Sequence, residues 1–166
     1  MDMLEKIKTR RSIREYQDRP IPKGDIEKII DAARFAATAR NVQPWKFVAV
    51  FNKETLRKIA SFSQNGEFIK GAALCIAVFC ADTKYYLEDG CSATVNIMLA
   101  AASLGIGSCW VAGDKKDYCP QVCSLLKAPV EFKLVSLVSL GYPAQKDSFV
   151  LKDKLPVSDL LRWEHF

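Results

Sequence analysis

The sequence predicts an α+β fold built around a central sheet. Helix-like and strand-like segments are mixed without the strict strand–helix–strand rhythm that a doubly wound parallel sheet requires. The longest apolar run, residues 72–81, has the length of one buried strand. No linker, internal repeat or shift in composition interrupts the sequence. We therefore expect a single domain over residues 1–166.

The first half of the chain carries clear periodic patterns. Ile26, Ile29 and Ile30 recur at helical spacing. A helix-start signal at Gly24-Asp25 precedes them. The expected elements in this half are helices at residues 2–8, 25–37 and 53–63, strands at residues 45–51 and 72–81, and a polar loop at residues 64–68.

The second half continues the mixture of helices and strands. We expect a helix at residues 89–104, a strand at 106–111, a helix beginning near Pro120, a strand at 131–143 and a tail at 144–166 that is polar and then amphipathic. One face of the helix at 89–104 carries little bulk, at Ala93, Asn96, Ala100 and Ser103. A second helix can approach such a stripe closely, so it suits a core helix and a tight homodimer equally.

The chain is mildly basic, with a net charge of +5 from 24 Lys and Arg against 19 Asp and Glu. It has no long basic tract and no aromatic–basic alternation, which argues against nucleic acid as a partner. No run of about 18 apolar residues is present, so no membrane partner is expected. Residues 1–8 are charged and lack the apolar core of a signal peptide, which predicts a cytoplasmic location.

Cysteine and histidine usage gives no metal site. Of the six cysteines, Cys119 and Cys123 form a single C-x3-C pair, which is a poor zinc signal. We expect them to pack as small apolar residues, with a redox role left open. The one histidine, His165, cannot supply a histidine-based triad or a multi-histidine metal site.

An arginine cluster, "TRRSIREY" at residues 9–16, is the first candidate site. Arg10, Arg11 and Arg14 surround the hydroxyl of Ser12 at the end of the first expected helix. Guanidinium groups bind phosphate with two parallel hydrogen bonds, and a hydroxyl adds a further donor. The cluster therefore favours a phosphorylated small molecule, with a merely solvated surface as the alternative.

Two further stretches of the sequence are each compatible with a binding role and with a purely structural role. "TARNVQPWKFVAV" (38–50) places Asn41 and Gln43 where amides could bind the edge of a flat heterocycle, or where Asn41 merely ends a helix before a buried Trp45. "LGIGS" (104–108) contains G-x-G, but a helix precedes it and a strand follows. That order is the reverse of a dinucleotide-binding turn, so Gly105 is expected to end the helix in a left-handed conformation.

Taken together, four segments in order resemble the nitroreductase family of FMN-dependent flavoproteins. They are "RRSIREY" (10–16), "AARFAATARNVQPWKFVAV" (32–50), "DGCSATVNIMLAAASLGIGSCWVAG" (89–113) and "LLKAPVEFKLVSLVSLGYP" (125–143). The resemblance implies the nitroreductase fold: a central, mostly antiparallel sheet flanked by helices, in an intertwined homodimer. It also implies an FMN at each interface site between the two subunits.

The resemblance assigns FMN-binding roles residue by residue. Arg10, Ser12 and Arg14 match phosphate and ribityl contacts, Arg11 lies nearby, and Lys154 matches a C-terminal basic residue at the phosphate. The residues matching the flavin pocket are Asn41 and Gln43, often supplied by the partner subunit, Asn65 near the pyrimidine edge, and Trp110, Val111, Ala112 and Gly113 beside the isoalloxazine, with backbone donors near N5. Thr38-Ala39 stands where the family has Pro-Ser, so the hydroxyl contact expected at Thr38 is altered.

The implied activity is a ping-pong oxidoreductase reaction. NADH or NADPH reduces the flavin at N5, and a small-molecule acceptor such as a nitroaromatic or a quinone then takes the electrons. No catalytic protein residue is assigned, because the flavin performs the chemistry. The alternatives are an FMN-storage or sensor module without turnover, a specialised reaction such as reductive dehalogenation, and a domain without cofactor. The segment between "ADTKYY" and "LEDGCSA" lacks the helical excursion of longer members, which argues against reactions that need a lid.

Overall fold

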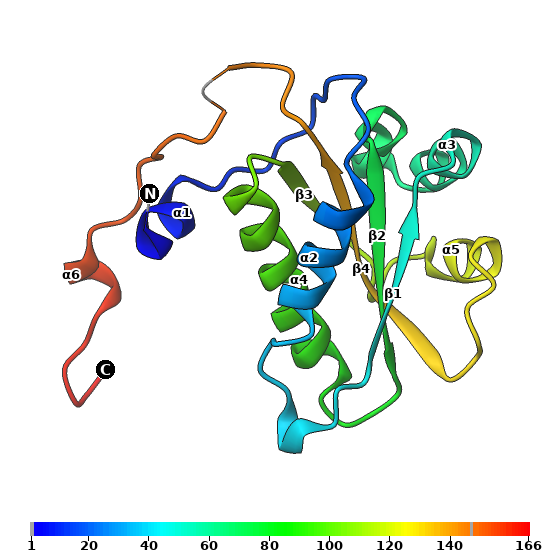
Figure 1. The fold of residues 1–166 in the computed structure, drawn as a ribbon. Helices are drawn as coiled ribbons and strands as arrows, with labels where there is room; N and C mark the ends of the chain where they lie inside the picture. The colour runs from blue at the N-terminus through cyan, green and yellow to red at the C-terminus, as the bar shows by residue number, and fades with distance from the viewer. Residues whose placement is uncertain (1, 147) are drawn as a thin grey trace.

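The computed structural model describes residues 2–146 and 148–166. A four-stranded sheet forms the centre, and helices cover both of its faces (Figure 1). The strands are β1 (Trp45–Val50), β2 (Leu74–Ala81), β3 (Gly107–Ala112) and β4 (Phe132–Gly141). The helices are α1 (Met3–Thr9), α2 (Lys23–Ala33), α3 (Lys53–Phe62), α4 (Tyr86–Ser103), α5 (Cys119–Leu125) and α6 (Val157–Leu160), with 3-10 helices η1 (Ala39–Asn41) and η2 (Gln64–Gly71).

The sheet has the strand order β1-β2-β4-β3, and every neighbouring pair is antiparallel. This confirms the α+β class and the antiparallel sheet. β2 and β4 are buried along almost their whole length because they lie in the middle of the sheet. β1 and β3 are the edge strands. Of all helices among residues 2–146 and 148–166, none is long and apolar enough to cross a membrane.

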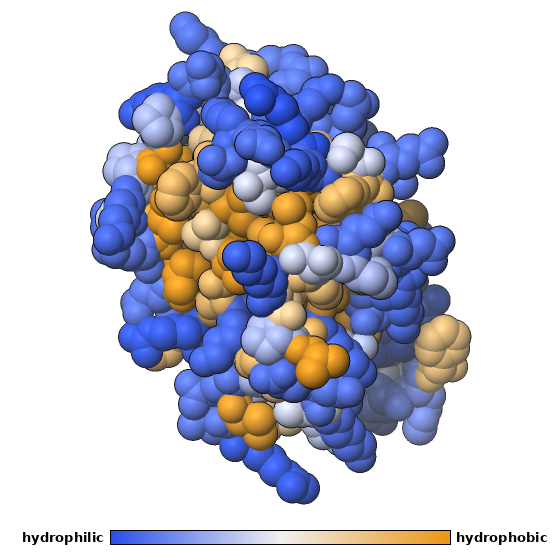
Figure 2. Space-filling model, turned by 90° about the vertical axis from the view of Figure 1, so that its right-hand side faces the viewer, coloured by the Kyte–Doolittle hydropathy of each residue, from blue (hydrophilic) through white to orange (hydrophobic). Residues whose placement is uncertain are grey.

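Each face of the sheet has its own apolar cluster. α2 and α4 cover one face, where Ile29 and Ile97 are fully buried. α3, η2 and α5 cover the other face around Leu56, Phe79 and Leu137. Figure 2 views the side that carries α3, α5 and the edge of β1: apolar atoms occupy its centre and polar atoms surround them.

Several predicted bounds differ from the structure, and the three largest differences concern α2, η2 and α4. The helix expected at residues 25–37 runs from Lys23 to Ala33, because the N–H groups of Phe35 and Ala36 turn to the carbonyls three residues earlier and end the helix. The expected polar loop at 64–68 lies in η2, and α4 begins at Tyr86, three residues before the predicted start. The prediction for Gly105 is confirmed, since its φ is 72° at the end of α4.

The C-terminal tail leaves the body on the side of α4 that faces away from the sheet (Figure 1). Every residue from 151 to 166 is exposed. Its exposed apolar side chains are Leu151, Leu155, Val157, Leu160, Leu161, Trp163 and Phe166. α1 also exposes Met3, Leu4 and Ile7. An exposed apolar set of this size is typical of a protein–protein contact.

Candidate functional site

The N-terminal segment runs along the free edge of β3. Ser12 and Ser108 form a parallel bridge, and the N–H of Ile13 donates to the carbonyl of Ser108 over 2.9 Å. This pairing places the arginine cluster beside β3, although the two segments lie far apart in the sequence. Two hollows lie along this segment, which we call the edge pocket and the cationic pocket. A smaller cavity shares Arg14 with the first and Ser12 with the second.

The edge pocket is a cavity of about 550 Å³ beside β3. It brings together five predicted site residues from three separate segments: Arg14, Asn65, Trp110, Val111 and Ala112. The sequence analysis missed the other lining residues, namely Phe62, Ser63, Gln64, Phe68, Cys109, Lys116, Asp117, Tyr118 and Gln121. The apolar periodicity of α3 could have indicated Phe62, whereas nothing in the sequence indicated the rest.

Backbone direction decides which groups of β3 face this pocket. Residues in an antiparallel strand turn their N–H and C=O groups alternately toward and away from the neighbouring strand. Because the Ser108 carbonyl binds Ile13 outside the sheet, the N–H groups of Trp110 and Ala112 also point away from β4. Ala112 can therefore donate to a flat ring system lying along the edge.

Gly113 differs from Ala112 in this respect. Its N–H donates to the carbonyl of Val135 over 3.1 Å, so the backbone donor expected at Gly113 is already engaged in the sheet. A Cβ at this position would lie 2.8 Å from Cγ of Leu134 and 2.9 Å from the backbone carbon of Val135. Gly113 thus allows the chain to leave β3 in close contact with β4, directly after Ala112 of the edge pocket.

Replacing Gly113 with alanine is expected to lower the free energy of unfolding by about 1–3 kcal/mol, because backbone atoms of β4 cannot move aside. Urea unfolding measures the change. Gly24→Ala is the matched control: a Cβ there meets nothing within 4 Å, and alanine suits helix α2 better than glycine. Equal stability of the two variants would contradict the packing argument.

The segment after Gly113 is anchored at both ends. The hydroxyl of Tyr86 donates to Oδ1 of Asp114 over 2.7 Å, and this bond to the carboxylate is the main reason that the pKa of Tyr86 rises to about 12. The hydroxyl of Tyr118 donates to the carbonyl of Ala112. Lys116 and Asp117, which line the edge pocket, lie between these two anchors.

The cationic pocket is a cavity of about 530 Å³ on the other side of the N-terminal segment. It brings together Arg10, Arg11 and Ser12 with Lys154 from the tail, as predicted. It also contains Lys152, which the sequence analysis missed. The signal was present in "KDKLP", because residues two apart in an extended chain face the same side. Among its described lining residues every ionisable side chain is cationic; the remaining ones are Ile13, Gln145, Ser148 and Val150.

The guanidinium groups of Arg10 and Arg11 differ in their hydrogen bonds. The Arg11 guanidinium donates to the carbonyls of Arg10 and Lys8 over 2.8 and 2.9 Å, so it satisfies the end of α1. Nη1 of Arg10 and Nε of Arg11 are both buried without a hydrogen-bond partner among residues 2–146 and 148–166, but only Arg11 also has two nitrogens engaged with backbone carbonyls. An orphaned guanidinium nitrogen beside a hydroxyl and two lysines is the donor set that a phosphate group would satisfy.

Besides Gly113, three predicted residues lie outside the linings of both pockets. Thr38, Asn41 and Gln43 belong to the loop around η1, at the end of the molecule where α4 begins (Figure 1). Asn41 and Gln43 are exposed. Trp45 is buried, as the anchoring role predicts. Within one chain this loop does not line either pocket.

The cysteine pair lies on α5, where Cys119 and Cys123 are partly buried against the second apolar cluster. Burial raises the pKa of both thiols. Because the thiolate is the reactive form, neither cysteine has the features of a reactive thiol. The packing interpretation accounts for their positions.

Comparison with known proteins identifies the family. The model of the nitroreductase family matches residues 7–73 and 65–142. The chain belongs to the nitroreductase family. A relative of this nitroreductase in Archaeoglobus fulgidus, named as an NADH dehydrogenase/NAD(P)H nitroreductase, is 40% identical over 160 residues, which are 92% of this chain and 91% of the relative.

Solved nitroreductase structures share its fold. A protein of Parabacteroides distasonis with the same kind of name is 28% identical and superposes with a TM-score of 0.92, over 99% of this chain and 98% of the other. An FMN-dependent nitroreductase of Clostridium difficile is also 28% identical and has a TM-score of 0.85, over 98% of this chain and 99% of the other. The nitroreductase fold predicted from the four motifs is confirmed.

Proposed function

We infer that this nitroreductase is an FMN-dependent oxidoreductase that takes electrons from NAD(P)H and passes them to a small-molecule acceptor. The observation that carries the inference is Nη1 of Arg10, which is buried and unpartnered among the described residues, in a pocket whose ionisable lining side chains are all cationic. The solved relative described as an FMN-dependent nitroreductase supports FMN as the ligand. When bound, FMN supplies the redox chemistry by accepting a hydride at N5 and releasing the electrons to the acceptor.

The chain's own residues bind and orient the cofactor. We assign the phosphate to Arg10, Ser12, Lys152 and Lys154, and the ring system to the edge pocket between Arg14 and the β3 edge. The N–H of Ala112 would donate to the ring. The guanidinium of Arg14 lies over the Phe68 ring at 5.6 Å, which keeps it at the pocket wall. No side chain is needed as a general acid or base, since solvent reaches the open pocket.

We further propose that two copies assemble around two FMN sites. The exposed apolar residues of the tail and α1 would be covered by the partner, and the loop at residues 38–43 would bring Asn41 and Gln43 to the partner's edge pocket. This arrangement explains why those two amides lie outside both pockets of their own chain. One functional domain over residues 1–166 and a cytoplasmic location remain predictions.

The absorption spectrum of the purified protein tests the function. We expect flavin bands that bleach when NADH or NADPH is added without air and that return when a quinone or nitroaromatic is added. Bands that persist with both nucleotides would favour an FMN-storage or sensor module. A protein that stays colourless in excess FMN would contradict the assignment of the cofactor.

A further inference from the structure

Asp89 is a buried carboxylate without a countercharge. It lies in the first turn of α4 and only 4% of its surface is exposed. No basic side chain lies within ion-pair distance of it among residues 2–146 and 148–166. Burying an unpaired carboxylate is costly, and a helix N-terminus offsets only a part of that cost. Hydrogen bonds must therefore offset the remainder of this cost.

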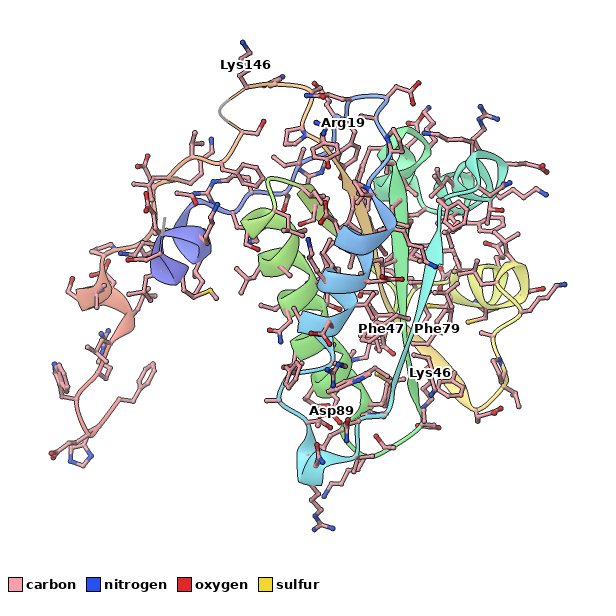
Figure 3. The ribbon with its side chains drawn as sticks, viewed as in Figure 1. Arg19, Lys46, Phe47, Phe79, Asp89 and Lys146 are labelled. Carbon is pink, nitrogen blue, oxygen red and sulfur yellow. The ribbon has the colours of Figure 1, made fainter. Side chains whose placement is uncertain are left out.

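Both carboxylate oxygens bind the loop that precedes β1. The hydroxyl of Thr38 donates to Oδ2 over 2.9 Å, and the N–H of Ala39 donates to Oδ1 over 3.1 Å. In Figure 3 Asp89 is labelled at the end of α4 beside the turn of η1. The contacts join positions about fifty residues apart, so they fix the loop to the rigid start of α4.

The hydroxyl of Thr38 extends this contact across the loop. It donates to Asp89 and accepts from the N–H of Gln43 over 3.2 Å. Arg40, Asn41 and Gln43 have φ values of 53°, 57° and 52°. A left-handed backbone is unfavourable for residues with a Cβ, and it persists only where the surroundings enforce it. The Asp89–Thr38 contact, together with the backbone hydrogen bonds of Asn41 and Val42 inside the loop, holds it in this conformation.

We propose that Asp89 is a positioning residue of the flavin site, which acts through Thr38 to hold the 38–43 loop so that Asn41 and Gln43 reach the flavin of the partner subunit. The proposal rests on the proposed FMN function and dimer. It gives the hydroxyl at position 38 a structural task in this chain. The loop backbone, rather than a direct contact of Asp89 with the cofactor, transmits the effect.

The test compares the full-length variants Asp89→Ala, Asp89→Asn, Thr38→Val and Thr38→Ser. FMN affinity is measured by flavin fluorescence quenching, and the environment of bound FMN by visible-region circular dichroism at saturation. We expect Asp89→Ala to weaken FMN binding about tenfold, as for a lost charge-assisted contact, and to change the visible spectrum. Asp89→Asn and Thr38→Val should show smaller losses of the same kind, and Thr38→Ser should restore wild-type binding.

Glu88→Gln is the matched control, because Glu88 is the exposed neighbour of Asp89 in the same helical turn. It removes one charge from the start of α4 and is expected to leave FMN binding unchanged. If Asp89→Ala does not fold, the FMN affinity and the visible spectrum of Asp89→Asn and Thr38→Val test the positioning role instead. Wild-type FMN affinity and an unchanged visible spectrum in these variants would overturn the positioning role while the FMN function stands. Failure of the wild-type protein to bind FMN would overturn both.

Discussion

Replacing Arg10 with alanine is expected to weaken FMN binding by roughly tenfold to more than a hundredfold. Nη1 of Arg10 is buried and unpartnered among the described residues, so a phosphate would make a charge-assisted contact with it. Such a contact contributes about 1.5–3 kcal/mol, which corresponds to that range of affinity. Fluorescence titration with FMN measures the change, and titration with riboflavin, which lacks the phosphate, should give the same affinity for variant and wild type.

Arg11→Ala is the matched control for Arg10→Ala. It removes the same charge from the neighbouring position, but both terminal nitrogens of the Arg11 guanidinium already donate to the carbonyls at the end of α1, which leaves only Nε without a partner among the described residues. We expect this variant to lower thermal stability and to change FMN affinity much less. Equal losses of FMN affinity in the two variants would mean that only the general positive potential matters, and the specific role of Arg10 would be abandoned.

Arg14→Ala tests the boundary between the two pockets. Arg14 is exposed, lies over Phe68, and lines the edge pocket, whereas Arg10 lines the cationic pocket. If this division is correct, Arg14→Ala weakens riboflavin and FMN alike. A loss confined to FMN would place Arg14 at the phosphate, as the motif resemblance implies.

Replacing Trp163 with glutamate is expected to raise the Kd of the proposed dimer by roughly thirtyfold or more. Trp163 is 83% exposed within one chain, and a buried tryptophan at an interface centre commonly contributes about 2 kcal/mol or more. Analytical ultracentrifugation over a dilution series measures the Kd. FMN affinity should fall with dissociation, because Asn41 and Gln43 would no longer reach the partner's site.

Phe51→Glu is the control for the tail. Phe51 is also an exposed aromatic residue, at 70%, but it lies where β1 meets α3, away from the tail. We expect it to leave the dimer intact. A substitution at a truly solvent-exposed site usually changes stability by less than about 0.5 kcal/mol. If Trp163→Glu is as silent as Phe51→Glu, the tail does not contribute to a dimer interface.

Local patterns in the sequence determined the elements and the family. The apolar run at residues 72–81 became β2, and the G-x-G stretch at 104–108 became a helix end followed by β3. Both outcomes follow from residues adjacent in the chain. The four motifs in order were likewise sufficient to indicate the nitroreductase fold and its cofactor, because motif residues keep their spacing whatever surrounds them.

Only the tertiary structure distinguished the members of each motif. The pairing of Ser12 with Ser108 determines that Ala112 faces the pocket while Gly113 is engaged with Val135. Long-range packing brings Lys152 and Lys154 of the tail to Arg10 and Ser12 at the other end of the chain. The contact between Asp89 and Thr38 crosses about fifty residues. Burial and hydrogen-bond partners depend on which distant segments meet, so residues of the same type at neighbouring positions acquire different roles only when the chain folds.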